Sequence, residues 1–283
     1  MEESTMTTDT SQPALWGGTA GNAWAELQDL LDRIFHPFEA LLAAGLAPRQ
    51  RVLDIGCGTG STTLAAARRV GLGGHCTGID ISAPMLAVAA RRAQEESLAI
   101  DFVQADAQRH AFAPAAFDAL ISRFGVMFFD DPVAAFARLH QAARHGAPLH
   151  VFAWRAAADN PFMTAAERAA APLIALPASV PGQPGQFAFA DAARVRAILD
   201  ASGWSDVAVV PADVPCAFPA AALERYITRM GIVGRVLPTL DAATRQAVLA
   251  AMRPAFEPFI DGDQVRFTAA CWQITARAAH TVR

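Results

Sequence analysis

Three alternating glycines and one acid lie close together in residues 51–60, which read RVLDIGCGTG. The apolar residues around Asp54 predict a buried parallel strand, and Gly56, Gly58 and Gly60 predict a sharp turn into a helix. Glycine permits positive φ angles and has no Cβ, so a ligand can approach the backbone closely. A carboxylate beside such a turn would repel a phosphate. Asp54 therefore favours a ligand with a cationic group.

Two further acids follow predicted strands at spacings that suit a nucleoside. Asp80 closes a second strand and lies 20 positions after Gly60, where the acid of a βαβ nucleotide fold hydrogen-bonds ribose hydroxyls. A third strand, over Ile100–Gln104, is followed by Asp106, which can accept a hydrogen bond from an adenine amino group. A fourth strand, over Phe117–Ser122, ends beside an arginine. The order of these elements predicts a nucleoside site at the carboxyl ends of the strands.

Together these four segments resemble the class I S-adenosylmethionine-dependent methyltransferases, in the style of the ubiquinone/menaquinone C-methyltransferase-like (type 11) group. The resemblance covers residues 27–154 well and the remainder weakly. It implies S-adenosylmethionine as cofactor, with Asp54 near its amino-acid end. The cofactor-binding residues that we predict on this basis are Asp54, Gly56, Cys57, Gly58, Gly60, Asp80, Ile81, Met85, Asp106, Ala107 and Ser122. Core packing is an open alternative for Met85, and turn capping is one for Asp106.

The catalytic residue is left unknown by the sequence. Methyl transfer from a sulfonium depends mainly on alignment, and a general base is required only when the acceptor must lose a proton early. The weak candidates are His36, Arg123 and Tyr226. Arg123 would orient a carboxylate or carbonyl of the acceptor, or else form a salt bridge to a nearby acid such as Asp54. Surface placement is the alternative for His36.

Apolar residues after the fourth strand predict the character of the acceptor site. Phe124, Phe128 and Phe129 supply walls for an apolar or aromatic acceptor, with core packing as the alternative. A metal-dependent mechanism is not expected, because Asp130–Asp131 is better explained as capping of the next helix.

Composition narrows the function classes further. The chain has 283 residues, is 53% hydrophobic and 18% charged, and has a net charge of −4. It therefore lacks the excess of positive charge that would indicate binding to nucleic acid or to an anionic membrane surface. It contains no lysine, which excludes Schiff-base chemistry and a P-loop lysine. Its four cysteines form no Cys-x-x-Cys pair, zinc signature or disulfide framework. We expect a cytoplasmic protein with a small-molecule substrate. Its oligomeric state is left open.

Strands and helices alternate through residue 154, which predicts an α/β fold. We expect a doubly wound, mostly parallel seven-stranded sheet with helices on both faces and a helical cap; the resemblance adds an antiparallel last strand. The predicted helices are two within Asn22–Leu42 interrupted at His36–Pro37, then Ser61–Val70, Pro84–Glu96, Pro132–Arg144, Asp191–Ser202, Pro219–Val233 and Asp241–Met252. The predicted later strands are Leu149–Trp154, Asp206–Val210 and Val265–Ala276.

The predicted organisation has four parts. Residues 1–12 form a disordered tail, 13–48 form N-terminal helices over the cofactor edge, 49–155 form the cofactor-binding half, and 156–283 supply the cap and the rest of the sheet. The sequence does not decide whether the cap moves.

The leading functional hypothesis is methyl transfer from S-adenosylmethionine to a small, largely apolar acceptor, by direct displacement without metal. Two alternatives remain open at this point. One is a nicotinamide-dependent oxidoreductase, which Asp54 and the Gly-x-Gly-x-Gly spacing disfavour. The other is a methyltransferase-fold binding module without catalytic activity.

Overall fold

The computed structural model describes residues 12–177, 180 and 182–279. Most of the expected N-terminal tail, residues 1–11, lies outside the described part, and Gln12 begins the first helix. Among the described residues, no helix is both long enough and apolar enough to span a bilayer. The four cysteines are free and buried.

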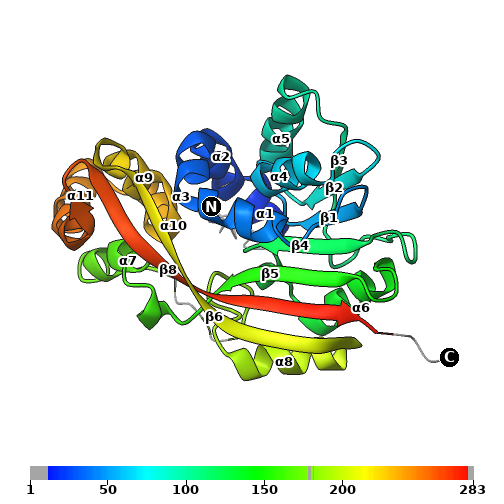
Figure 1. Ribbon diagram of the computed structural model, residues 1–283. Coiled ribbons are helices and arrows are strands. Elements are labelled where there is room, and N and C mark those ends of the chain that lie inside the picture. Colours follow the sequence, from blue (N-terminus) through cyan, green and yellow to red (C-terminus); the bar gives the residue numbers. More distant parts are fainter. Residues whose placement is uncertain (1–11, 178–179, 181, 280–283) are drawn as a thin grey trace, which may run out of the picture.

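One mixed sheet with the order β3-β2-β1-β4-β5-β8-β6 runs through the molecule (Figure 1). The first five strands of that order are parallel, and β8 lies antiparallel between β5 and β6. A two-residue strand, β7, pairs with β8. The bounds are β1 Arg51–Ile55, β2 His75–Asp80, β3 Ile100–Gln104, β4 Ala119–Arg123, β5 Pro148–Trp154, β6 Trp204–Pro219, β7 Ile260–Asp261 and β8 Gln264–Ala278. The predicted fold class is confirmed, with β7 as an addition.

Helices cover both faces of this sheet. In the view of Figure 1, α3, α4 and α5 lie above it and α6 and α8 below it. Their bounds are α3 Gln28–Ala43, α4 Ser61–Val70, α5 Ala83–Glu95, α6 Pro132–Ala142 and α8 Ala192–Ala201. Asp131 caps α6 as predicted, because its carboxylate accepts the backbone N–H of Ala134 at 3.0 Å and Pro132 follows it.

The N-terminal helices differ from the prediction. The structure has α1 (Gln12–Gly17), α2 (Thr19–Glu26) and α3, and the break falls at Leu27 instead of His36–Pro37. Pro37 lies inside α3, where it removes one backbone hydrogen bond. The buried side chains on both sides of it, Ile34 and Phe38 among them, hold the helix continuous against the core.

β6 is much longer than the predicted strand over Asp206–Val210. It contains Pro211, Pro215 and Pro219 at every fourth position and forms the edge of the sheet next to β8. Alternate residues of a strand direct their N–H groups to the same side, so the three prolines share one side of β6, and an edge strand has one side that needs no donors. An edge strand tolerates this pattern of prolines. In the sequence, the same prolines indicate the end of a strand, and the predicted strand was therefore too short.

The cap sits at the far end of the β6–β8 ladder. β5 pairs only with residues 271–277 of β8, and the part of β8 before that pairs with β6 and carries the cap away from the sheet (Figure 1). The cap helices are α7 Ala165–Ala170, α9 Leu223–Arg229, α10 Gly231–Val236 and α11 Ala242–Ala255. Short 3-10 turns lie at Val126–Phe128, Ala157–Asp159, Ala220–Ala222, Leu237–Thr239 and Glu257–Phe259. The single helix predicted over Pro219–Val233 is wrong, because Gly231, with a φ of +70°, separates α9 from α10.

Candidate active site

A cavity of about 720 Å³ opens at the carboxyl ends of β1, β2 and β4 and extends beneath the cap. Its volume is in the range of small-molecule and cofactor sites. The strand ends supply one part of its lining, and the cap and N-terminal helices supply the other. The predicted site residues that line it are Gly56, Gly58, Asp80, Ile81, Met85, Asp106, Ala107, Arg123 and Tyr226.

The glycine loop has the conformation that its sequence predicts. Gly56 and Gly58 have φ angles of +66° and +53°. A Cβ on Gly56 would stand 2.6 Å from the Cα of Gly125, so the turns after β1 and β4 touch. A Cβ on Gly58 would meet only the sulfur of Met85, at 3.6 Å, and this part of the loop backbone therefore faces the cavity.

Asp80 is the acid best placed to hold a polar ligand. Its Oδ2 accepts the backbone N–H of Gly58 and its Oδ1 that of Ser82, each at 2.8 Å. A carboxylate has about four lone-pair sites, so both oxygens retain capacity for hydroxyl donors from the cavity. Burial raises the pKa of Asp80 to about 6, although the two backbone hydrogen bonds oppose the shift. The residue fits a ribose.

We predicted Asp54 near the amino-acid end of the cofactor, but Asp54 does not line the cavity, and this part of the prediction is wrong. Its carboxylate is 1% exposed and accepts the hydroxyls of Thr62 and Thr63, at 2.6 and 2.7 Å, at the start of α4. Neighbouring strand residues point to opposite faces, and it is Ile55 that lines the cavity. Burial raises the pKa of Asp54 against these hydrogen bonds. Asp54 therefore supports the loop from beneath and makes no direct contact with the cavity.

Three other predicted cofactor contacts also lie behind the cavity wall: Cys57, Gly60 and Ser122 are buried and outside its lining. Ser122 donates to the carbonyl of Ile55 at 2.6 Å and so joins the ends of β4 and β1. A Cβ on Gly60 would stand 2.9 Å from that of Ala89, so Gly60 permits close packing of α5. The pKa of the Cys57 thiol is raised by burial and by nearby acids, which makes it a poor nucleophile.

Asp106 lines the cavity with its carboxylate already engaged. Oδ1 accepts the backbone N–H of Gln108 and Oδ2 accepts its side-chain amide, both at 3.0 Å. These bonds close the turn after β3, and Gln108 joins the cavity lining beside it. Gln108 is a site residue that we did not predict.

Aromatic rings form a wall of the cavity beside the ends of β4 and β5 and along the N-terminal helices. The predicted Phe124, Phe128 and Phe129 line the cavity, and Trp16, Trp24 and Trp154 join them. Phe124 has a φ of +64°, which is an unfavourable region for a bulky residue. Stacking on Trp154, at 4.5 Å between ring centroids, holds it in place. The wall suits an apolar, ring-containing guest.

Arg123 reaches the cavity from the end of β4. Its Nη1 donates to the Ser61 hydroxyl at 3.1 Å, and its guanidinium lies 5.5 Å from the centroid of the Phe35 ring. No acid of the described chain comes within ion-pair distance, so the alternative of a salt bridge to Asp54 is wrong. Burial lowers its pKa, while the charges of Asp32 and Glu39 oppose that effect. Arg123 offers a free donor face to an anionic or carbonyl oxygen.

The other two catalytic candidates, His36 and Tyr226, differ in their position relative to the cavity. His36 lies outside the cavity lining, with 76% of its side chain exposed and a contact of 3.5 Å to Glu39. It follows Phe35, which does line the cavity, and one helical step turns it outward. The Tyr226 hydroxyl lies 3.8 Å from the Met163 sulfur, and burial raises its pKa. A raised pKa does not suit Tyr226 to act as a base.

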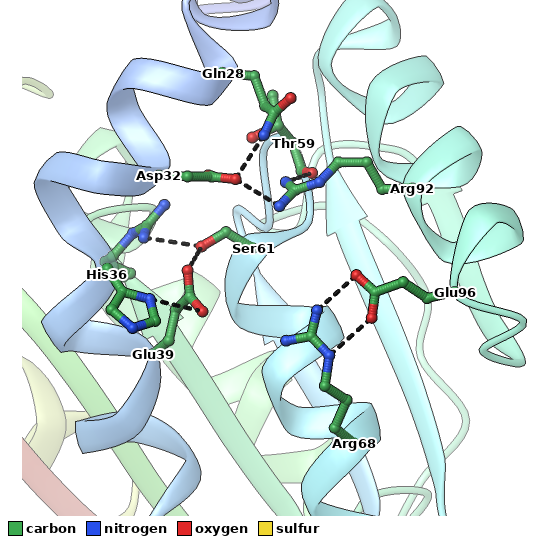
Figure 2. Close-up of polar contacts among 10 residues, drawn as sticks. Gln28, Asp32, His36, Glu39, Thr59, Ser61, Arg68, Arg92 and Glu96 are labelled. Atoms are coloured by element: carbon green, nitrogen blue, oxygen red, sulfur yellow. Dashed lines mark hydrogen bonds and ion pairs between the residues drawn. The ribbon is translucent and has the colours of Figure 1, made fainter.

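A polar network fixes α3 over the glycine loop (Figure 2). Arg92 donates to the carbonyl of Thr59 at 2.6 Å and pairs with Asp32 of α3. The Ser61 hydroxyl donates to Glu39, also of α3, at 2.8 Å. The loop is thereby held between α3 and α5, which makes it a rigid part of the site.

Known proteins similar to this chain show its family. Residues 52–146 match the family model described as "Methyltransferase domain". A demethylmenaquinone methyltransferase from Mycolicibacterium vanbaalenii is 31% identical over 174 residues, which are 58% of this chain and 72% of that protein. The chain belongs to the class I S-adenosylmethionine-dependent methyltransferases. The cofactor that goes with this family is S-adenosylmethionine.

Other similar proteins match this chain over shorter stretches. An uncharacterised protein of Mycobacterium tuberculosis is 33% identical over 127 residues, 44% of this chain and 45% of that protein. An aklanonic acid methyltransferase from a Streptomyces species is 39% identical over 98 residues, 34% of this chain and 44% of that protein. This chain thus spans less than half the length of these two relatives.

A solved structure agrees with the fold. A methyltransferase structure from Bacillus halodurans superposes with a TM-score of 0.56 at 16% identity, covering 86% of this chain and 98% of the other.

The cap half of the methyltransferase cavity carries charged groups that the sequence did not reveal. Glu167 of α7 and Arg235 of α10 both line it and are half-buried. Arg225 and Arg229 of α9 pair with Asp29 and Glu26, at 3.0 and 2.8 Å, and connect the cap to α3 and α2. Of these two arginines, Arg229 also lines the cavity. These pairings depend on tertiary contacts between segments far apart in the chain, for which the sequence gives no signal.

Proposed function

We propose that this methyltransferase moves the methyl group of S-adenosylmethionine to a small, largely apolar acceptor by direct displacement without a metal ion. The observation that carries the proposal is one cavity with two kinds of lining. The ends of β1 and β2 present the Gly58 backbone and the Asp80 carboxylate, whereas the ends of β4 and β5 and the N-terminal helices present aromatic rings. Polar groups thus meet the nucleoside and rings meet the acceptor.

When bound, S-adenosylmethionine supplies an electrophilic methyl group on its sulfonium. Asp80 would accept the ribose hydroxyls through the lone pairs that Gly58 and Ser82 leave free. Ile81 and Met85 would flank the adenine, and Asp106 with Ala107 would meet its edge. Arg123 would hold the carboxylate of the cofactor or an oxygen of the acceptor. The aromatic wall would align the acceptor and exclude water.

Calorimetric titration with S-adenosylhomocysteine tests this proposal. The wild type is expected to bind one equivalent, and Asp80→Asn is expected to bind at least about tenfold more weakly, because hydrogen bonds to a charged group are among the stronger ones. Asp101→Asn is the matched control, since that carboxylate lies on β3, is 71% exposed and pairs with His75. Absence of binding by the folded wild type would contradict the proposal. Equal affinity of the two aspartate variants would contradict the role of Asp80.

A further inference from the structure

Glu167 and Arg235 are an unpaired acid and base on an apolar wall. Both line the cavity in its cap half, beside Phe162, Met163 and Ile232. Their charges act on each other, yet no ion pair or side-chain hydrogen bond joins either one to another residue of the described chain. Removing a charge from water is unfavourable unless a partner compensates. Burial accordingly raises the pKa of Glu167 and lowers that of Arg235.

Surface charges of the same cap behave differently. Glu224 and Arg253 lie on α9 and α11, outside the cavity lining, and make direct contact at 3.1 Å. Charged residues that only stabilise the cap are therefore expected to form direct ion pairs, as Glu224 and Arg253 do. The open arrangement of Glu167 and Arg235 occurs where a ligand can reach both groups.

The position of Arg235 is fixed by the backbone around it. A Cβ on Gly234 would stand 2.4 Å from the carbonyl carbon of Arg229, so α10 packs closely on the end of α9. Gly231 supplies the positive φ that starts α10. Arg235 is thus presented from a short, tightly packed helix, which is suitable for a specific contact.

On the basis of the proposed function, we propose that Glu167 and Arg235 together select the acceptor by binding an uncharged polar group that donates one hydrogen bond and accepts another. The Glu167 carboxylate accepts a hydrogen bond from the N–H or O–H of this group, and the Arg235 guanidinium donates one to its oxygen. The two charges sum to zero, so a carboxylate would gain from Arg235 but be repelled by Glu167. A primary amide, or a hydroxyl beside a carbonyl, on an apolar ring body satisfies both. The aromatic wall receives the ring.

The test uses two probes of nearly equal shape, 2-naphthamide and 2-naphthoate, titrated calorimetrically into the protein saturated with S-adenosylhomocysteine. The wild type is expected to bind the amide at least about tenfold more tightly than the carboxylate, in line with charge-assisted hydrogen bonds. Arg235→Gln should weaken the binding of both probes. Glu167→Gln should weaken amide binding and strengthen carboxylate binding, a reversal that a merely structural role would not produce.

Glu224→Gln and Arg253→Gln are matched controls in the same cap and are expected to leave both affinities within about twofold. No binding of the amide, equal affinity for the two probes, or no reversal in Glu167→Gln would overturn the inference. Failure of S-adenosylhomocysteine to bind the wild type would instead contradict the proposed function. The two failures are therefore distinguishable.

Discussion

The contact between the glycine loop and the turn after β4 allows a prediction in three substitutions. Gly56→Ala introduces a side chain where φ is +66° and places its Cβ 2.6 Å from the Cα of Gly125. Gly125→Ala meets the same contact from the other side, with its Cβ 2.5 Å from the carbonyl oxygen of Ile55, while its own φ of −78° is favourable. Gly146→Ala has a φ of +75° and open space around its Cβ.

These differences separate backbone strain from steric overlap. Left-handed φ for alanine costs about 1–2 kcal/mol, and overpacking costs about 1–3 kcal/mol. Gly146→Ala should lower the free energy of unfolding by the first amount, Gly125→Ala by the second, and Gly56→Ala by about 2–5 kcal/mol if the two add.

Urea denaturation measures the three stabilities, and calorimetry with S-adenosylhomocysteine measures the site. Gly146 lies outside the cavity lining, so its variant should bind with unchanged affinity, whereas Gly56→Ala should bind at least about tenfold more weakly. A Gly56→Ala protein as stable as Gly146→Ala and with wild-type affinity would refute the reasoning.

Three further predictions concern single side chains. Burial raises the pKa of Asp80 to about 6, and the ionised form accepts hydroxyls on both oxygens. Affinity for S-adenosylhomocysteine should therefore fall about tenfold from pH 7 to pH 5. Asp80→Asn should lose this pH dependence, and equal pH profiles for the variant and the wild type would contradict the prediction. Ser122→Ala removes the 2.6 Å hydrogen bond to Ile55 and should cost about 1–3 kcal/mol in urea denaturation; an unchanged midpoint would argue against that role. Tyr226→Phe loses only a 3.8 Å contact to the Met163 sulfur, so methyl transfer should stay within about twofold of wild type; a large loss of kcat would restore Tyr226 as a catalytic residue.

Local signals explain the parts of the fold that the sequence predicted well. α4 has the predicted bounds because the glycine turn starts it and Gly71 follows its end. Asp80 ends a strand and lines the cavity, as its spacing from the glycine loop indicated, because that spacing can be read directly from the sequence. β6 was predicted too short because the prolines reveal nothing about which side of a strand is open.

The direction of a side chain was the harder question. Asp54 and Ile55 are adjacent in one buried strand, and only packing decides which of them reaches the cavity. His36 and Phe35 are likewise neighbours on α3, with opposite outcomes. Glu167 and Arg235 lie far apart in the chain and line the same cavity only because α7 and α10 pack together in the cap. Such pairs arise from tertiary structure and leave no local pattern.

The position of bound S-adenosylhomocysteine in a crystal structure tests the central claim most directly. The account predicts both ribose hydroxyls within hydrogen-bond distance of the Asp80 carboxylate and the homocysteine sulfur directed toward the aromatic wall. A ligand bound elsewhere, or one whose ribose lies away from Asp80, would contradict it.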